Sequence, residues 1–269
     1  EREREMLAVF HKAFAQPPQE LHSPMAASCA GGGRRAPKQP EEILRAFHAA
    51  HPDDSFSATF SGGAALASVT SSSHFSVQYR QLFCSLDGIY CLFSGNLNNL
   101  SSLIRQYGLC KATNEALLVI EAYRTLRDRA PYPADQVVKD LHGSFAFVVY
   151  DNKSGTVFAA LSADGGVPLF WGIAADGSAV ISDEVEIIKG SCVKSFAPFP
   201  TGCMFHSEAG LRSFEHPMNR MKAMPRVDSE GVMCGSNFKV DASSRISTMP
   251  RVGSAANWTS YWADAPQQL

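Results

Sequence analysis

The residues of this chain that could support acid-base or metal chemistry include two histidines near two glutamates in the carboxyl-terminal half. His206 is followed by Glu208, and His216 is preceded by Glu215. A metal site needs three or four ligands whose spacing brings them together, and no three-ligand spacing repeats here. We therefore expect these four residues to be polar surface residues, and we predict no metal site and no cofactor.

Cysteine thiolates could act as nucleophiles or metal ligands. The seven cysteines are residues 29, 84, 91, 110, 192, 203 and 234. Their odd number and the lack of a C-x-x-C pair favour buried reduced thiols over a disulfide framework or a zinc site. Cys91 and Cys203 lie in apolar strands with no adjacent base in the sequence, so we expect both in the core. Cys84 should face Cys91 across an Asp87-Gly88 hairpin, too far apart for a disulfide.

Composition and charge are those of a globular protein. The chain has 269 residues, of which 45% are hydrophobic and 19% charged, with a net charge of -2. It lacks a basic excess for nucleic acid, a run of about 20 apolar residues for a membrane span, and the layout of a signal peptide. We therefore predict a protein of the cytoplasm, with the nucleus as a second location, without nucleic-acid or integral membrane contact.

Hydrophobic periodicity predicts two groups of strands separated by helices. Helices are expected over Glu41–His51, Asn98–Tyr107, Thr113–Arg127, from Pro133 onward and over Glu184–Gly190. Strands are expected in Met6–Phe10, FSATF, AALASV, FCSLDGIYCLF, SFAFVVYD, TVFAALS, PLFWGIA, AVIS, GCMFHS and GLRSF. Ser61-Gly62-Gly63 and Asp164-Gly165-Gly166 are expected to be turns, and the region after Pro217 to be less periodic. This order favours an α+β fold of two sheets with helices outside them.

Several separate segments together resemble class II glutamine amidotransferase domains. They are FSGNLNNL (93–100), ATNEALLV (112–119), DLHGSFAFVVYD (140–151), ADGGVPLFWG (163–172) and VISDEVEIIK (180–189). The tags Tyr107-Gly108-Leu109 and Leu126-Arg127-Asp128-Arg129 resemble more closely the plant aluminium-induced or stem-specific protein family. The resemblance implies the amino-terminal nucleophile (Ntn) hydrolase fold, a four-layer αββα sandwich.

The sequence departs from the resembled enzymes at the positions that matter for catalysis. Class II amidotransferases attack glutamine with an amino-terminal Cys whose α-amine is the base, and Leu7 stands at that position. Their Asn-Gly oxyanion turn is Ser94-Gly95 here, followed by Asn96, and their ammonium-binding Asp is matched by Thr113, beside Asn114.

These departures leave a vestigial pocket with no catalytic residue. Its predicted members are Leu7, His11, Ser94, Gly95, Asn96, Thr113 and Asn114. Loss of such a nucleophile costs on the order of 10⁶ in turnover. The resemblance therefore implies a pseudoenzyme, a stress- or hormone-responsive binding or regulatory module.

Two other functions stay open. One is a divergent amidohydrolase or small-molecule sensor that reuses the vestigial pocket and needs a base such as His11 or His74 near Ser94. The other is a partner subunit of a synthetase or signalling complex, which predicts a large exposed apolar patch.

The expected organisation is a single amidotransferase-like domain over residues 6–258. Residues 1–5 are expected to be a non-native leader, residues 23–40 a flexible loop within the domain, and residues 259–269 a disordered tail. We expect a homodimer formed through exposed sheet or helix faces, and a protein partner.

Overall fold

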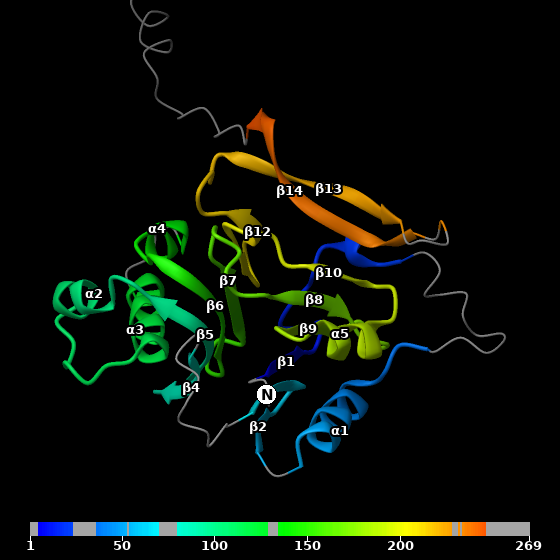
Figure 1. Cartoon of the computed structure of the whole chain (residues 1–269), viewed down its shortest axis with the longest axis horizontal. Helices are drawn as coiled ribbons and strands as arrows, with labels where there is room; N and C mark the ends of the chain where they lie inside the picture. Colours follow the sequence, from blue (N-terminus) through cyan, green and yellow to red (C-terminus); the bar gives the residue numbers. More distant parts are fainter. Residues whose placement is uncertain are drawn as a thin grey trace, which may run out of the picture.

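The computed structural model describes residues 5–23, 36–52, 54–69, 80–128, 134–227, 231 and 233–245. The expected leader, except Glu5, lies outside these ranges, as do the expected tail and residues 24–35 of the expected loop. Within them, two six-stranded sheets lie face to face and helices cover their outer faces (Figure 1).

The first sheet contains the strand whose start carries Leu7. Its strand order is β10-β8-β9-β1-β3-β2, and its strands are β1 (Met6–Phe10), β2 (Ser55–Phe60), β3 (Ala64–Val69), β8 (Phe170–Ile173), β9 (Ala179–Ser182) and β10 (Phe196–Pro198). The central strand β1 is antiparallel to both neighbours, with Leu7 opposite Ala67 on β3 and Ser182 on β9. Because β1 has a partner on each side, its backbone position is tightly fixed.

The second sheet carries the Ser94-Gly95 segment. Its order is β12-β11-β7-β6-β5-β4, and its strands are β4 (Arg80–Leu86), β5 (Ile89–Leu97), β6 (Gly143–Asp151), β7 (Thr156–Leu161), β11 (Cys203–His206) and β12 (Gly210–Ser213). Asp87 and Gly88 both have positive φ in the β4–β5 turn, as a tight hairpin requires. Cys84 and Cys91 are opposite each other as expected, and no disulfide joins any of the cysteines in the described residues.

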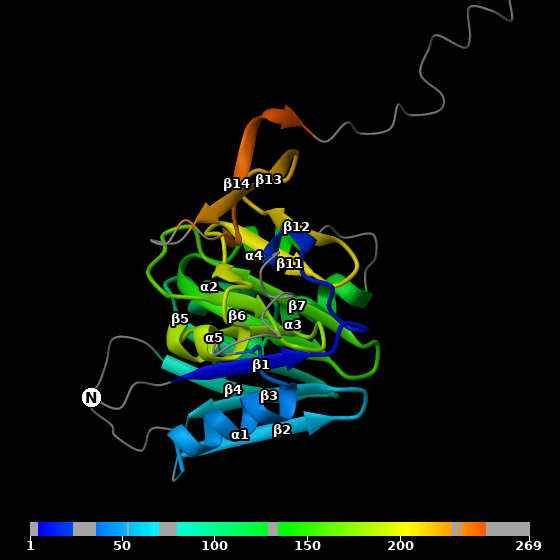
Figure 2. The same ribbon diagram turned by 90° about the vertical axis from the view of Figure 1, so that its right-hand side faces the viewer.

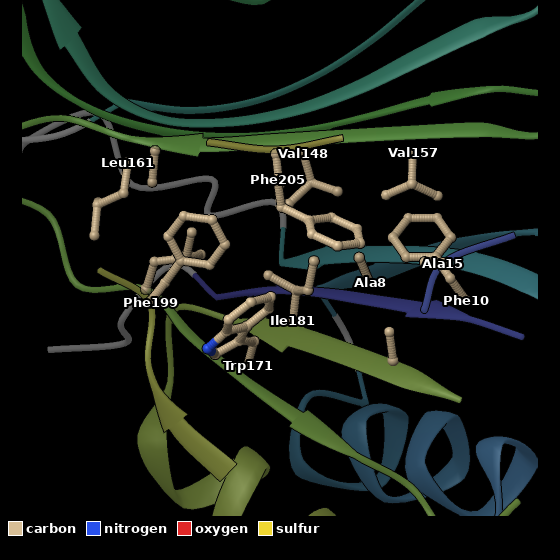
Figure 3. Close-up of a cluster of buried hydrophobic side chains, with 14 of the residues drawn as sticks. Ala8, Phe10, Ala15, Val148, Val157, Leu161, Trp171, Ile181, Phe199 and Phe205 are labelled. Carbon is tan, nitrogen blue, oxygen red and sulfur yellow. The ribbon is translucent and has the colours of Figure 1, made fainter. Parts of the chain in front are cut away.

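Three apolar layers hold the four structural layers together. Between the sheets lie Phe10, Trp171, Phe199 and Phe205 with small residues such as Ala8 (Figure 3). A second layer packs the outer face of the first sheet against α1 (Pro40–Ala50) and α5 (Val185–Cys192). The third packs the outer face of the second sheet against α2 (Leu100–Gln106), α3 (Glu115–Asp128) and α4 (Ala134–Lys139). The predicted α+β sandwich with outside helices is therefore correct.

Two predictions about local structure are wrong. The last helix does not end at Gly190 but continues to Cys192, and Val193 follows with a φ of 55°. The side chains of Ser191 and Cys192 are buried, so two further helical residues gain packing that outweighs the preference of a glycine to end a helix.

The region after Pro217 is also regular, contrary to the prediction. Strands β13 (Asn219–Val227) and β14 (Met233–Arg245) form a separate two-stranded sheet that extends along the end of the sandwich at β10 and β12 (Figures 1 and 2). Phe238 and Met221 anchor it on the core between the sheets. Exposure alternates along most of β13, a strand period that Pro225 interrupts.

Candidate functional site

Leu7 occupies the position that matches the nucleophile of the resembled enzymes. Its side chain is fully buried and belongs to the apolar layer with Ile43, Phe47 and Ile188 of the covering helices. Alternate residues of a strand face opposite sides of its sheet, and Met6, Ala8 and Phe10 instead belong to the layer between the sheets. Leu7 therefore points away from the space between the two sheets.

The start of β1 is held by polar groups that precede α5. The backbone N–H of Met6 donates to Oδ1 of Asp183 at 2.8 Å, and the hydroxyl of Ser182 donates to the carbonyl of Met6 at 2.7 Å. Burial raises the pKa of Asp183 to about 8, with smaller contributions from the nearby charges of Glu5 and Glu184 and opposition from the Met6 N–H. Sequence reasoning missed Asp183, although its segment was one of those that carried the resemblance.

Ser94, Gly95 and Asn96 lie at the end of β5. Ser94 pairs with Ala146 on β6 and, like Ala146, faces the other sheet. Gly95 has a φ of +113°, and a Cβ placed there would lie 2.1 Å from the carbonyl oxygen of Ser144. The backbones of β5 and β6 approach so closely that only glycine fits, which explains why Gly95 is needed in this fold whether or not its N–H binds a substrate.

Thr113 and Asn114 directly precede α3 in the helical layer outside the second sheet. Oδ1 of Asn114 accepts the N–H of Leu117 at 2.9 Å, so Asn114 caps α3. The Asn114 amide also lies 3.4 Å from the sulfur of Cys84 on β4. Asn114 is therefore occupied in attaching α3 to the sheet.

His11 lies at the far end of β1 from Leu7. The ring of the preceding Phe10 packs 5.6 Å from Tyr150, which pairs with Tyr90 near the β4–β5 turn. Ser94 lies four residues further along β5 than Tyr90, and four residues of an extended strand span about 13 Å. The structure therefore does not bring His11 to Ser94, and His74, the other base considered, lies outside the described residues.

Taken together, the predicted pocket residues do not converge on one point. Leu7 and Asn114 belong to the outer layers on opposite sides of the sandwich, Ser94 faces the space between the sheets, and His11 is at the other end of β1. In the part of the chain that the structure describes, no hydrogen bond joins any two of them.

A carboxylate outside the predicted set organises the end of the second sheet. Asp164 accepts hydrogen bonds from the hydroxyls of Ser144 and Ser162, the latter at 2.6 Å, and from the N–H of Gly166 at 3.2 Å. The two hydroxyls lower the pKa of Asp164. The Asp164-Gly165-Gly166 segment is a turn, as predicted, and its aspartate links the start of β6 to the end of β7.

Beside Asp164 lies a cavity of about 450 Å³. Its apolar wall consists of Leu141, Phe145 and Phe214, which belong to the layer outside the second sheet. Its polar lining groups come from three chain segments and are Lys139, His142, Ser162, Asp164, Glu215 and His216. The cavity therefore opens on the side of the sheet opposite to Ser94.

Two further histidines, His48 and His206, have local structural partners. Both ring nitrogens of His48 form hydrogen bonds, to the hydroxyls of Ser55 at 2.8 Å and Ser57 at 2.9 Å. These hydrogen bonds connect α1 to β2. His206 is half-buried against Phe158, and burial lowers its pKa. Burial likewise raises the pKa values of the Cys91 and Cys203 thiols, which suits core packing and not nucleophilic attack.

In the described part of the chain, no group of three or more His, Cys, Asp or Glu side chains could hold a metal ion. None of the described helices has the length and apolar character needed to cross a membrane.

Residues 7–240 match the sequence pattern of a family described as Aluminium induced protein. The stem-specific protein TSJT1 of Nicotiana tabacum is 39% identical over 155 residues, which are 58% of this chain and 99% of that protein.

Weaker similarity extends to synthetases that are much longer. A probable glutamine-hydrolyzing asparagine synthetase of Dictyostelium discoideum is 46% identical over 74 residues, 28% of this chain and 13% of that protein. Asparagine synthetase 2 of Oryza sativa subsp. japonica is 30% identical over 115 residues, 42% of this chain and 19% of that protein. The matched segments thus span less than a fifth of either synthetase.

The fold is similar to that of a solved amidotransferase. The glutamine phosphoribosylpyrophosphate amidotransferase of B. subtilis, in complex with ADP and GMP, matches with a TM-score of 0.50 and 14% identity. The match covers 80% of this chain and 50% of that chain. The predicted class II amidotransferase fold is confirmed, and at this identity the likeness concerns the fold alone.

Proposed function

The chain belongs to the aluminium-induced protein family, and from this premise we propose that it is a non-catalytic binding or regulatory module with a glutamine amidotransferase fold. The observation that carries the proposal is the environment of Leu7. Leu7 occupies the position of the nucleophile in the amidotransferase fold, and its side chain has no reactive atom. It is fully buried against the helices and points away from Ser94.

Other residues support the same function. Where a donor for an oxyanion and a carboxylate for the substrate ammonium would be expected, the chain has Ser94 and Thr113. One lost oxyanion donor alone typically costs about 10² to 10³ in rate. The alternative function, a hydrolase that reuses this pocket, needs a base beside Ser94, and His11 lies at the other end of the sandwich.

The names of the relatives suggest when the protein acts. A family described as aluminium-induced and a stem-specific relative lead us to propose a stress-responsive protein that acts by binding, as a homodimer or with a protein partner. Its abundance before and after aluminium exposure tests the first part, and its mass in solution tests the second.

The decisive experiment on catalysis measures ammonia release from glutamine and asparagine by the purified chain. We expect no release above a heat-denatured sample. Release that is abolished by Ser94→Ala would overturn the proposal and show that the vestigial pocket still performs hydrolysis.

A further inference from the structure

We propose that the cavity beside Asp164 binds a small zwitterion with an apolar side group, such as a free amino acid of phenylalanine type. The inference goes beyond the proposed function, because it assigns a place and a ligand class on the opposite face of the sheet from Ser94.

The shape of the cavity suits a small molecule. Its volume of about 450 Å³ lies within the range of about 300 to 1,000 Å³ usual for ligand pockets. Leu141, Phe145 and Phe214 line the cavity and are themselves buried residues, so its inner wall is formed by the edge of the apolar layer. Such a wall favours an aliphatic or aromatic group over a sugar or a free phosphate.

The charges around the wall have both signs. Lys139 supplies a cation at the end of α4, while Glu215, just after β12, supplies an anion. Within the described residues, neither side chain takes part in a hydrogen bond or an ion pair. Both are therefore available to a ligand that carries a carboxylate and an ammonium group.

The site is also positioned by fixed groups. Asp164 is held by three hydrogen bonds, and its neighbour Ser162, 2% exposed, accepts the N–H of Phe145 at 3.1 Å. A Cβ on Gly202 would lie 2.6 Å from the Glu215 carboxylate, so this glycine leaves room for the Glu215 side chain beside the backbone. The Asp164 part of the site is therefore preformed, and a preformed group loses less freedom on binding than a flexible one.

His142 and His216 complete the polar lining. A neutral imidazole has one donor and one acceptor nitrogen, so both residues can bond either end of a zwitterion. An anionic or cationic ligand alone would leave one of the charged groups of the cavity unpaired, which favours the zwitterion.

The test is a calorimetric titration of the full chain with L-phenylalanine. Phenylalaninamide lacks the carboxylate and N-acetylphenylalanine lacks the ammonium group, so each should bind about tenfold more weakly, the effect typical of one lost charged hydrogen bond. L-glutamine, with the same charged groups and a polar side chain, tests the apolar wall and should also bind more weakly.

Variants locate the binding. Lys139→Met and Glu215→Gln should each weaken L-phenylalanine about tenfold, whereas Lys111→Met and Glu208→Gln, at exposed positions that do not line the cavity, should leave it unchanged. Ala163→Trp, an exposed position at the rim, should block binding while circular dichroism shows a folded chain.

Lack of heat on titration, equal affinity for all four compounds, or binding insensitive to both cavity variants would overturn the inference. Ammonia release measured on the same samples tests the proposed function separately, since ligand binding in this cavity requires no hydrolysis.

Discussion

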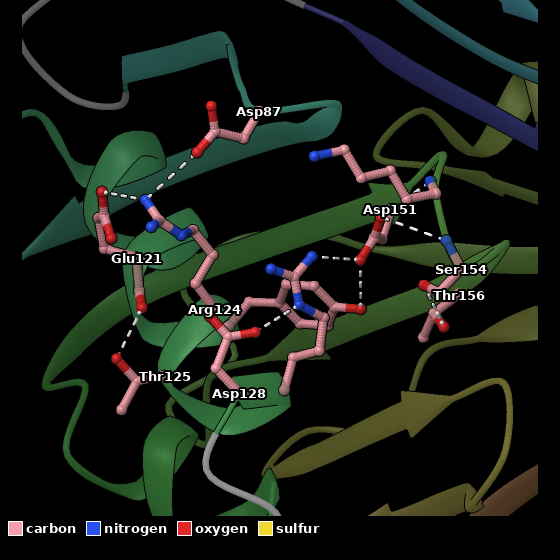
Figure 4. A network of polar contacts seen from close by, with 11 residues as sticks. Asp87, Glu121, Arg124, Thr125, Asp128, Asp151, Ser154 and Thr156 are labelled. Carbon is pink, nitrogen blue, oxygen red and sulfur yellow. Dashed lines mark hydrogen bonds and ion pairs between the residues drawn. The ribbon is translucent and has the colours of Figure 1, made fainter.

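Arg127, in the last turn of α3, reaches the buried carboxylate of Asp151 at the end of β6, with 3.0 Å between Nη1 and Oδ2 (Figure 4). Tyr123 donates to the same oxygen at 3.3 Å, and the other oxygen accepts the N–H groups of Lys153 and Ser154. Burial alone would raise the pKa of Asp151, but the hydrogen bonds from Arg127, and after it from Lys153 and Ser154, hold that pKa below its ordinary value. The tag that indicated the family thus joins the helical layer to the second sheet and has a structural role.

The first prediction concerns this ion pair. Arg127→Met leaves the fully buried Asp151 without its cation, and removing one partner of a buried pair is strongly destabilising. We expect a loss of roughly 3 kcal/mol in the free energy of unfolding, the low end for such pairs because a third of the Arg127 side chain is exposed. Urea denaturation monitored by circular dichroism measures it.

Two comparisons make this prediction specific. Arg124→Met breaks only contacts with the more exposed Glu121 and Asp87 and should cost less than about 1 kcal/mol. Combining Arg127→Met with Asp151→Asn should restore much of the stability, since the amide oxygen still accepts from the turn. A double variant as unstable as the sum of the two single variants would contradict the pairing.

The second prediction concerns Leu7. Because its side chain lies against α1 and α5, Leu7→Ala should cost about 2 to 5 kcal/mol in stability. Leu7→Cys should introduce a thiol that a water-soluble thiol reagent reaches only after denaturation, and it should not produce glutaminase activity. Fast labelling of one additional thiol in the folded variant, relative to the unsubstituted chain, would place residue 7 in an open pocket.

The sequence was sufficient to predict the layers and most elements because burial imposes a period on each of them. Strands such as β6 and β7 are long apolar runs, and the Asp87-Gly88 turn has residues that accept positive φ. The site was harder to predict. The sequence shows that Leu7 replaces the nucleophile. It does not show which side of the sheet Leu7 faces, because either set of alternate residues of β1 could pack against the other sheet.

The cavity was missed for a related reason. Lys139, Asp164 and Glu215 are each separated by 25 or more residues in the sequence and meet only because β6, β7, β11 and β12 are neighbours in one sheet. The absence of a repeated ligand spacing predicts that Glu215 and His216 are polar surface residues, and both are exposed. Local spacing does not show that they also line a cavity. Long-range strand pairing carries this information, and local spacing does not.

The third prediction concerns the surface of the two-stranded sheet. Lys222 on β13 is directly opposite Lys239 on β14, and both residues are exposed. Like charges opposite each other destabilise a strand pair. Lys222→Glu should therefore raise the free energy of unfolding by roughly 0.5 kcal/mol, more than Lys222→Gln, as measured by thermal denaturation.

Salt provides the control for this pair. At about 1 M salt, where charges are screened beyond about 3 Å, the difference between Lys222→Glu and Lys222→Gln should largely vanish. A gain that persists at high salt would have a cause other than charge.

The last prediction concerns pH and follows from Asp183. Its pKa of about 8 in the folded chain is well above the ordinary value of about 3.9 for an unfolded chain. Between these values the folded state binds a proton that the unfolded state has released, so the free energy of unfolding should fall as the pH rises from about 4 to 8. The contribution of this one group is at most about 1.4 kcal/mol per pH unit.

Two variants test the role of Asp183. Asp183→Asn still offers an oxygen to the Met6 N–H but does not titrate, so the stability of this variant should fall less steeply over this pH range. Asp140→Asn, at an exposed position, should retain the slope of the unsubstituted chain. Parallel stability curves for Asp183→Asn and the unsubstituted chain would mean that the Asp183 carboxyl is ionised in the folded state at neutral pH, and that the start of β1 is held by an anion and not by a neutral acid.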